Sequence, residues 1–209
     1  MAALILAFVV LGHPAYGSAQ TQSASPASSS PEGMAAAAGL FLAGGATAFV
    51  AHEGGHLFFD LLFEADPGIG KVEFHGIPFF AITHRSGLAP REEFTISSAG
   101  FWVQEATNEW LLSKRPRLKD ERAPFAKGMF AFNVIASGVY AGAAFARTGP
   151  AERDTRGMAD SLGIDERWIG AIVLAPAVLD TWRYYQPDAK WVAWVSRAVK
   201  VGSVLLVLK

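Results

Sequence analysis

Five consecutive residues, His52-Glu53-Gly54-Gly55-His56, form the pattern HExxH and are the strongest chemical signal in the chain. On a helix, residues four positions apart project from one face, so the imidazoles of His52 and His56 can reach the same Zn²⁺ ion. Glu53 follows the first histidine and is placed to accept a proton from water rather than to bind the metal. The motif therefore predicts a zinc hydrolase with Glu53 as its general base.

Zinc held by two histidines still needs a third protein ligand and one open position. The candidates are four carboxylates, Asp60, Glu105, Glu109 and Asp180. Asp180 is the first choice, because it stands in an apolar segment where an unpaired carboxylate is costly. Glu105 or Glu109 is the alternative ligand. Asp60, four residues after His56, either hydrogen-bonds a ligand imidazole or marks the end of an apolar helix.

Composition favours a membrane protein over an ordinary soluble domain. Of the 209 residues, 51% are hydrophobic and only 18% are charged. The formal net charge of −1 lacks the excess of basic residues typical of a nucleic-acid-binding protein, so we expect no nucleic-acid partner. The absence of cysteine excludes a disulfide framework, a thiolate metal site and a cysteine nucleophile.

The predicted fold class is mainly α, a polytopic membrane protein with about four membrane helices. The four spans are residues 34–63, which carry the HExxH motif, 125–146, 168–182 and 191–208. Two short extended runs, 71–75 and 78–84, predict a small re-entrant β-hairpin. Residues 95–112 are helical in pattern but include several polar side chains, which favours an interfacial helix.

Residues 114–127 contain six basic and two acidic side chains and are expected to stay in the cytoplasm. Residues 125–146 would then run outward, the loop 147–167 would lie outside, and Asp180 would return close to the cytoplasmic face. The span 34–63, entered from outside, would bring HEGGH to that same face. This topology requires that residues 95–112 do not cross fully; otherwise Asp180 and HEGGH fall on opposite sides.

The N-terminal part of the chain predicts a separate targeting segment. Residues 1–19 indicate a signal peptide or an uncleaved anchor, and residues 20–33, rich in Ser, Ala and Pro, indicate a disordered linker. Residues 34–209 form the predicted membrane-embedded, metalloprotease-like domain. We expect an integral protein of a bacterial-type inner membrane, with its active site near the cytoplasmic face.

Several of these features together resemble the site-2 protease family of membrane-embedded zinc metalloproteases. They are HEGGH in an apolar helix, the extended segment GKVEFHGIPFFAITH, an Ala99-Gly100 turn into a helix, and a later apolar helix ending in Leu179-Asp180. Thr181 stands where the family has glycine. The resemblance implies that His52, His56 and Asp180 hold zinc, that Glu53 is the base, and that a re-entrant β-element positions an extended substrate.

The sequence thus predicts a zinc-dependent intramembrane endopeptidase that hydrolyses a peptide bond in membrane protein substrates. Its expected partners are the substrate segment and the lipid bilayer, and its expected cofactor is Zn²⁺. One alternative is a non-catalytic membrane scaffold or accessory subunit with a degenerate zinc-binding helix. Another is a membrane-anchored peptidase of a different class that uses Glu105 or Glu109 as its third ligand.

Overall fold

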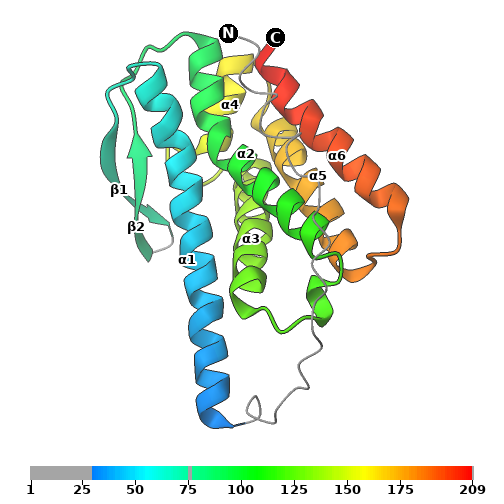
Figure 1. Ribbon diagram of the computed structural model, residues 1–209. Helices are drawn as coiled ribbons and strands as arrows, with labels where there is room; N and C mark the ends of the chain where they lie inside the picture. The colour runs from blue at the N-terminus through cyan, green and yellow to red at the C-terminus, as the bar shows by residue number, and fades with distance from the viewer. Residues whose placement is uncertain (1–29, 75–76, 209) are drawn as a thin grey trace. The chain divides into compact units, whose positions relative to one another are not determined.

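The computed structural model describes residues 30–74 and 77–208 (Figure 1). Ala35–Lys209 form one compact unit. The signal peptide or anchor predicted over residues 1–19 lies outside the described residues, as does most of the linker predicted over 20–33. The end of that linker is helical, because the first helix already begins at Pro31.

The described chain is mainly helical with a two-stranded sheet, which confirms this part of the predicted fold class. In chain order the elements are α1 (Pro31–Leu62), β1 (Gly68–Phe74), β2 (Ile77–Thr83), α2 (Pro90–Lys114), η3 (Leu118–Asp120), α3 (Pro124–Ala146), α4 (Asp154–Leu162), α5 (Glu166–Tyr185), α6 (Lys190–Leu205) and η4 (Leu206–Leu208). The predicted elements correspond to α1, the hairpin, α2, α3, α5 and α6, whereas α4 occupies a predicted loop.

Local chemistry accounts for several of these boundaries. Pro90 and Pro124 lie in the first turns of α2 and α3, where a helix does not use the missing N–H group. Gly163 ends α4 with a left-handed backbone, φ 64°, as is common at helix C-termini. The Asp165 side chain accepts a hydrogen bond from the Arg167 backbone N–H and caps α5. A short connection therefore holds α4 close to the start of α5.

Helices α1 and α3 run in the same direction. Near the start of α3, the backbone of Phe125 packs directly on Gly44 of α1, where a Cβ atom would leave no room. Further along both helices, the ring of His52 stacks beside that of Tyr140, with 6.0 Å between ring centroids. Positions later in α1 thus face positions later in α3, so the two helices are parallel.

Helix α2 runs back along α3 in the opposite direction. Gln104 lies 3.4 Å from Ser137, and one turn later in α2 the amide of Asn133 donates to Asn108 over 2.9 Å. Later positions in α2 therefore contact earlier positions in α3. Since α2 has 25 residues, it extends roughly 37 Å and spans much of the bundle.

This arrangement differs from the predicted topology, in which the segments 34–63 and 125–146 ran in opposite directions. That prediction required that residues 95–112 do not cross the membrane fully; these residues belong to α2, which is not among the described helices that are long and apolar enough to span a membrane. The side of the membrane on which HEGGH and Asp180 lie stays a prediction. The HExxH motif packs on the first half of α2, and Asp180 lies beside its second half.

The hairpin connects α1 to α2 and is antiparallel, with Gly68 opposite Thr83 and Phe74 opposite Ile77. Its open end is joined to α1 by backbone hydrogen bonds. The N–H of Ala65 donates to the carbonyl of Asp60, and the N–H of Arg85 donates to the carbonyl of Ala65, each over 2.8 Å. These contacts fix the hairpin beside the C-terminal half of α1, which carries the motif.

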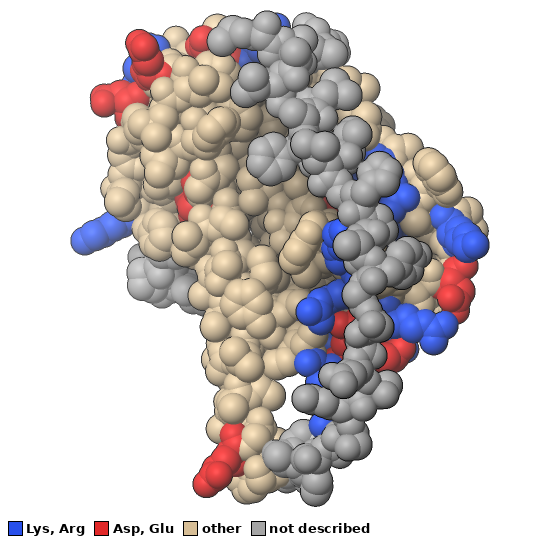
Figure 2. Space-filling model, viewed as in Figure 1, with Lys and Arg blue, Asp and Glu red and all other residues tan. Residues whose placement is uncertain are grey.

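Several polar side chains are buried in this bundle, and several large apolar side chains are exposed. Polar side chains of α2 are buried, including Ser98 at 0%, Gln104 at 2% and Asn108 at 4% exposure. Large apolar side chains of α1 are exposed, including Leu42 at 70% and Leu61 at 62%. Figure 2 shows few charges over most of α1, whereas charged side chains gather toward α6.

Two of the four predicted spans, α1 and α3, are long and apolar enough to cross a membrane, among the helices of residues 30–74 and 77–208. At about 1.5 Å per residue, the 23 residues of α3 match a hydrocarbon core of about 30 Å. The predicted spans in α5 and α6 do not meet this standard. Helix α6 has only 16 residues, and α5 carries Asp180 and Arg183 in its second half.

Candidate metal centre

The two histidines of HExxH face the interior of the bundle from one side of α1. His52 is 3% exposed and His56 is 5% exposed. Their Nε2 atoms lie 3.2 Å apart, as the spacing of four residues on a helix predicts. Both imidazoles therefore present a nitrogen to the same point, and the sequence prediction that they converge is confirmed.

The carboxylate at this point belongs to Asp154, the first residue of α4. Its Oδ2 atom lies 3.3 Å from His52 Nε2 and 3.5 Å from His56 Nε2. His52, His56 and Asp154 form the group of potential metal ligands within the described part of the chain, with their ligand atoms all within 4.8 Å of one another. Two imidazoles and one carboxylate can hold a metal ion.

Contacts with α2 fix the orientation of both rings. The Nδ1 atom of His56 lies 2.8 Å from the carbonyl oxygen of Ile96, which can only accept, so Nδ1 carries the proton and Nε2 is free to bind a metal. The ring of His52 lies directly against Gly100, where any Cβ atom would overlap it. The His52 Nδ1 atom is buried and makes no hydrogen bond to the described residues.

The charge of Asp154 suits the role of a ligand. Burial by itself would raise the pKa of this carboxyl group, but the adjacent imidazoles of His56 and His52 outweigh burial and hold the pKa well below its ordinary value. Asp154 is therefore ionised at neutral pH. An ionised carboxylate beside two imidazole nitrogens is a set of ligand types that divalent metal ions bind.

Glu53 lies next to His52 in α1 but points toward the hairpin. Its Oε2 atom accepts a hydrogen bond of 2.8 Å from the backbone N–H of Ile82 in β2. Ile82 is opposite Ile69 of β1, and its N–H is directed to Glu53 rather than to that strand. The edge of β2 that does not pair with β1 therefore faces the HExxH motif.

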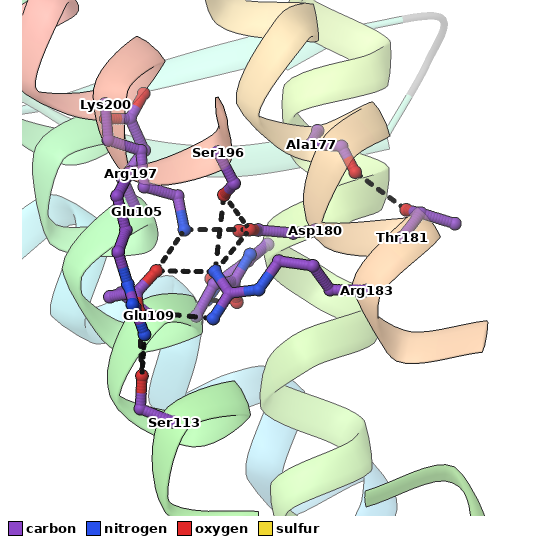
Figure 3. A network of polar contacts seen from close by, with 12 residues as sticks. Glu105, Glu109, Ser113, Ala177, Asp180, Thr181, Arg183, Ser196, Arg197 and Lys200 are labelled. Carbon is purple, nitrogen blue, oxygen red and sulfur yellow. Dashed lines mark hydrogen bonds and ion pairs between the residues drawn. The ribbon is translucent and has the colours of Figure 1, made fainter. Parts of the chain in front are cut away.

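Asp180, the predicted third ligand, lies elsewhere, in a cluster between α2, α5 and α6 (Figure 3). Its Oδ1 atom accepts hydrogen bonds of 2.8 Å from Lys200 and 2.7 Å from Ser196. The structure thus places Asp154 where the sequence analysis placed Asp180. The cost of a carboxylate in an apolar helix was the basis of that choice, and here an ammonium group from α6 compensates it.

The alternative ligands also lie away from the histidines. Glu109 accepts hydrogen bonds from Arg183 at 2.5 Å and Arg197 at 2.8 Å, and Glu105 accepts one from Ser203 at 3.0 Å. Both belong to the α2–α5–α6 cluster shown in Figure 3. Neither is among the potential metal ligands of the described residues, so the peptidase with Glu105 or Glu109 as third ligand finds no support in the geometry.

Asp60 does not hydrogen-bond a ligand imidazole, since His56 Nδ1 is engaged by Ile96. Its carboxylate is 0% exposed and faces His84, with 3.5 Å between Asp60 Oδ1 and His84 Nδ1. The other ring nitrogen of His84 lies 3.0 Å from Glu93 of α2. These contacts connect His84, which follows β2, to Asp60 in α1 and to Glu93 in α2.

Sequence reasoning missed Asp154 because it lies within residues 147–167, which were predicted to be an external loop. Several charged residues precede and follow it, among them Glu152, Arg153 and Arg156. Among so many charged residues, Asp154 does not stand out as a ligand. Pro150 and the nearby charges are compatible with a helix N-terminus, but nothing in the sequence points to a ligand.

Searches of protein-family models, curated proteins and solved structures found no match to this chain. The resemblance to the site-2 proteases therefore rests on the quoted residues alone and stays a prediction. One of its elements differs, because Ala99 and Gly100 lie inside α2 rather than at a turn before a helix.

Proposed function

We propose that this chain is a zinc-dependent peptidase that cleaves a peptide bond in membrane protein substrates. The observation that carries the proposal is the convergence of His52, His56 and Asp154 beside Glu53. Zinc hydrolases typically combine three protein ligands and an adjacent carboxylate in this way. The motif and the geometry thus support the same chemistry, with Asp154 in place of Asp180 as the proposed third ligand.

The spacing of the three ligand atoms fits zinc. In tetrahedral coordination with bonds of about 2.0–2.1 Å, neighbouring ligand atoms are separated by about 3.3 Å. The three separations here are 3.2, 3.3 and 3.5 Å. A zinc ion held by His52, His56 and Asp154 would supply a Lewis acid that polarises a carbonyl group and acidifies water.

Glu53 would move the proton during peptide-bond hydrolysis. One carboxylate oxygen, Oε2, is held by the Ile82 N–H, and Oε1 makes no hydrogen bond to another described residue. We assign Oε1 as the atom that accepts a proton from the attacking water and returns it to the leaving amine. The hydrogen bond from Ile82 would hold the Glu53 carboxylate in one orientation.

The free edge of β2 would bind the substrate as an added strand. Unpaired N–H and C=O groups at a sheet edge pair readily with an extended peptide. Because the contact between Glu53 and Ile82 brings this edge to the motif, a peptide added there would pass close to the proposed metal. Recognition would use main-chain hydrogen bonds, which act on any extended segment of a membrane protein.

The membrane setting is part of the proposal. Exposed apolar side chains on α1 and buried polar side chains on α2 suit a lipid environment. If the basic residues 114–127 lie in the cytoplasm, the parallel course of α1 and α3 places the motif toward the opposite face. We therefore replace the expected cytoplasmic position of the active site by one in the other half of the bundle.

The proposal is tested by reconstituting the full chain in lipid vesicles with a mixture of single-span membrane proteins. New N-termini are then identified by mass spectrometry. We expect cleavage by the wild type with added zinc, and loss of at least about 100-fold in Glu53→Gln, which keeps the size but not the charge of the base. Equal cleavage by both proteins contradicts the proposal. Bound zinc without any cleavage would favour the non-catalytic scaffold.

A further inference from the structure

A pocket of about 320 Å³ lies far along α2 from the proposed active site. It is formed by the C-terminal end of α2, the turn between α5 and α6, and the first turns of α6. Arg183, Lys190 and Arg197 line it together with Ser113 and Trp194. None of its lining residues in the described chain is acidic. The pocket therefore presents three cationic side chains.

The ion pairs behind the pocket leave an excess of positive charge. Figure 3 shows Arg183, Arg197 and Lys200 directed toward Glu109 and Asp180. Glu109 lies 2.5 Å from Arg183, 2.8 Å from Arg197 and 3.3 Å from Lys200. Asp180 is shared between Lys200 and Arg183. Three cations thus share two carboxylates.

The third carboxylate of the cluster, Glu105, does not neutralise this excess positive charge. Burial raises its pKa to about 8, against the opposing effects of the Ser203 hydroxyl and Lys200. It is therefore mainly neutral at pH 7. Lys190, which also lines the pocket, is exposed and makes no ion pair with the described residues. The local surplus is then about two positive charges.

Donors remain available inside the pocket. Arg197 uses its Nε for Glu109 and its Nη2 for Ser113, which leaves Nη1 without a described partner. An anion with several oxygen atoms fits this combination of an arginine and a lysine.

Helix α6 carries exposed tryptophans, and one of them, Trp194, lines the pocket. Trp194 is 71% exposed and lies under the Arg197 guanidinium at 5.9 Å. Trp191 is 56% exposed and packs edge-on against Trp182 with 5.2 Å between centroids. Exposed tryptophans of this kind are typical of the headgroup level of a bilayer.

We propose that this pocket binds a phosphate group, supplied by the headgroup of an anionic phospholipid or by a soluble phosphate ester. The exposed tryptophans of α6 and the basic residues 114–127 nearby suit a lipid of the cytoplasmic leaflet, which is rich in anionic headgroups. This inference does not depend on peptidase activity. The site is separate from the histidines and would function with or without a metal.

The test uses the purified full chain in an uncharged detergent, with bound lipid counted by native mass spectrometry. Phosphatidylglycerol, phosphatidylcholine and inorganic phosphate are the three probes. We expect saturable phosphatidylglycerol binding, weakened at least about tenfold by Lys190→Gln and by Arg197→Gln. The matched control is Lys71→Gln, which removes an exposed lysine of β1 and should leave the affinity unchanged.

Each outcome decides the proposal. Binding of inorganic phosphate with the same sensitivity to Lys190→Gln supports a soluble ligand, and sensitivity of phosphatidylglycerol alone supports a lipid. Equal binding of phosphatidylcholine, or an unchanged affinity in Lys190→Gln, overturns the site. Lys190 makes no side-chain contact in the ion-pair cluster, so its variant remains informative even if Arg197→Gln unfolds.

Discussion

The backbone N–H of Ile82 donates a 2.8 Å hydrogen bond to the Glu53 carboxylate and so joins the hairpin to the helix that carries HExxH. A sequence motif alone does not predict this contact, because the two residues are 29 positions apart and the donor is a main-chain group. The contact defines which edge of the hairpin faces the candidate metal centre. It also gives a direct way to perturb Glu53 without changing its side chain.

Ile82→Pro removes that donor. The Ile82 N–H lies on the edge of β2 that does not pair with β1, a position where proline is tolerated. We expect peptidase activity to fall about tenfold or more, because Glu53 loses the group that orients it, with bound metal unchanged. Ile69→Pro is the matched control, since Ile69 is paired with Ile82 in register but belongs to β1. A similar loss in both variants would mean that the hairpin fold, rather than the contact, is affected.

Gly100→Ala should displace the ring of His52, since the added methyl group has no space beside it. We expect metal affinity to fall about 10- to 100-fold, as when the surroundings of a metal ligand are disturbed. Gly54→Ala is the control, because a Cβ atom there meets no neighbour within 4 Å. Competition with a chromogenic chelator measures both affinities. Equal affinities would contradict the described packing of α2 on the motif.

Lys200→Met should destabilise the fold without releasing the metal. The substitution removes one of the cations that contact Asp180, which is 1% exposed, and Glu109. Breaking such a buried ion pair lowers the free energy of unfolding by about 3–5 kcal/mol. The double variant Asp180→Asn/Lys200→Met should recover part of this loss. Denaturant titration in detergent gives the unfolding free energy. A double variant less stable than Lys200→Met would contradict the pairing.

The contact between His84 and Glu93 predicts a pH dependence. The hydrogen bond to Glu93 raises the pKa of His84, and the hydrogen bond from His84 lowers the pKa of Glu93. The contribution of Glu93 is lost as pH falls through its lowered pKa, and that of His84 is lost as pH rises through its raised pKa. Stabilisation is therefore greatest between the ordinary values of about 4.3 and 6.5.

The corresponding measurement compares the thermal midpoints of wild type and His84→Gln from pH 4 to pH 10. We expect the difference to be largest near pH 5–6 and to shrink at alkaline pH. Arg85→Gln, next in the chain, serves as the control for a general loss of positive charge. A difference that stays constant with pH would show that the ion pair does not form.

The sequence predicted the elements well because their signals are local. The apolar run around HEGGH and the Gly/Pro punctuation around the hairpin are such signals, and α1, β1 and β2 follow them closely. The convergence of His52 and His56 follows from helix geometry alone. Relative directions of helices do not have local signals, so the parallel course of α1 and α3 was not predicted.

The choice of the third metal ligand also depended on contacts that have no local signal in the sequence. Asp180 attracted attention because burial of a charge is costly, but sequence alone does not show whether the compensating partner is a metal or a lysine. Lys200 lies 20 residues later and supplies that partner. Asp154 stands in a charged, turn-like stretch where an acidic residue is unremarkable. Only the packing of α4 on α2 turns it toward the histidines.

The measurement that tests the central claim most directly is the zinc content of the purified full chain and three variants. We expect about one zinc per chain in the wild type and in Asp180→Asn, and loss of bound zinc in His56→Ala and Asp154→Asn. Asp154→Asn and Asp180→Asn make the same chemical change at the two competing positions. Zinc retained by Asp154→Asn and lost from Asp180→Asn, or a folded wild type that binds none, would contradict the proposed centre.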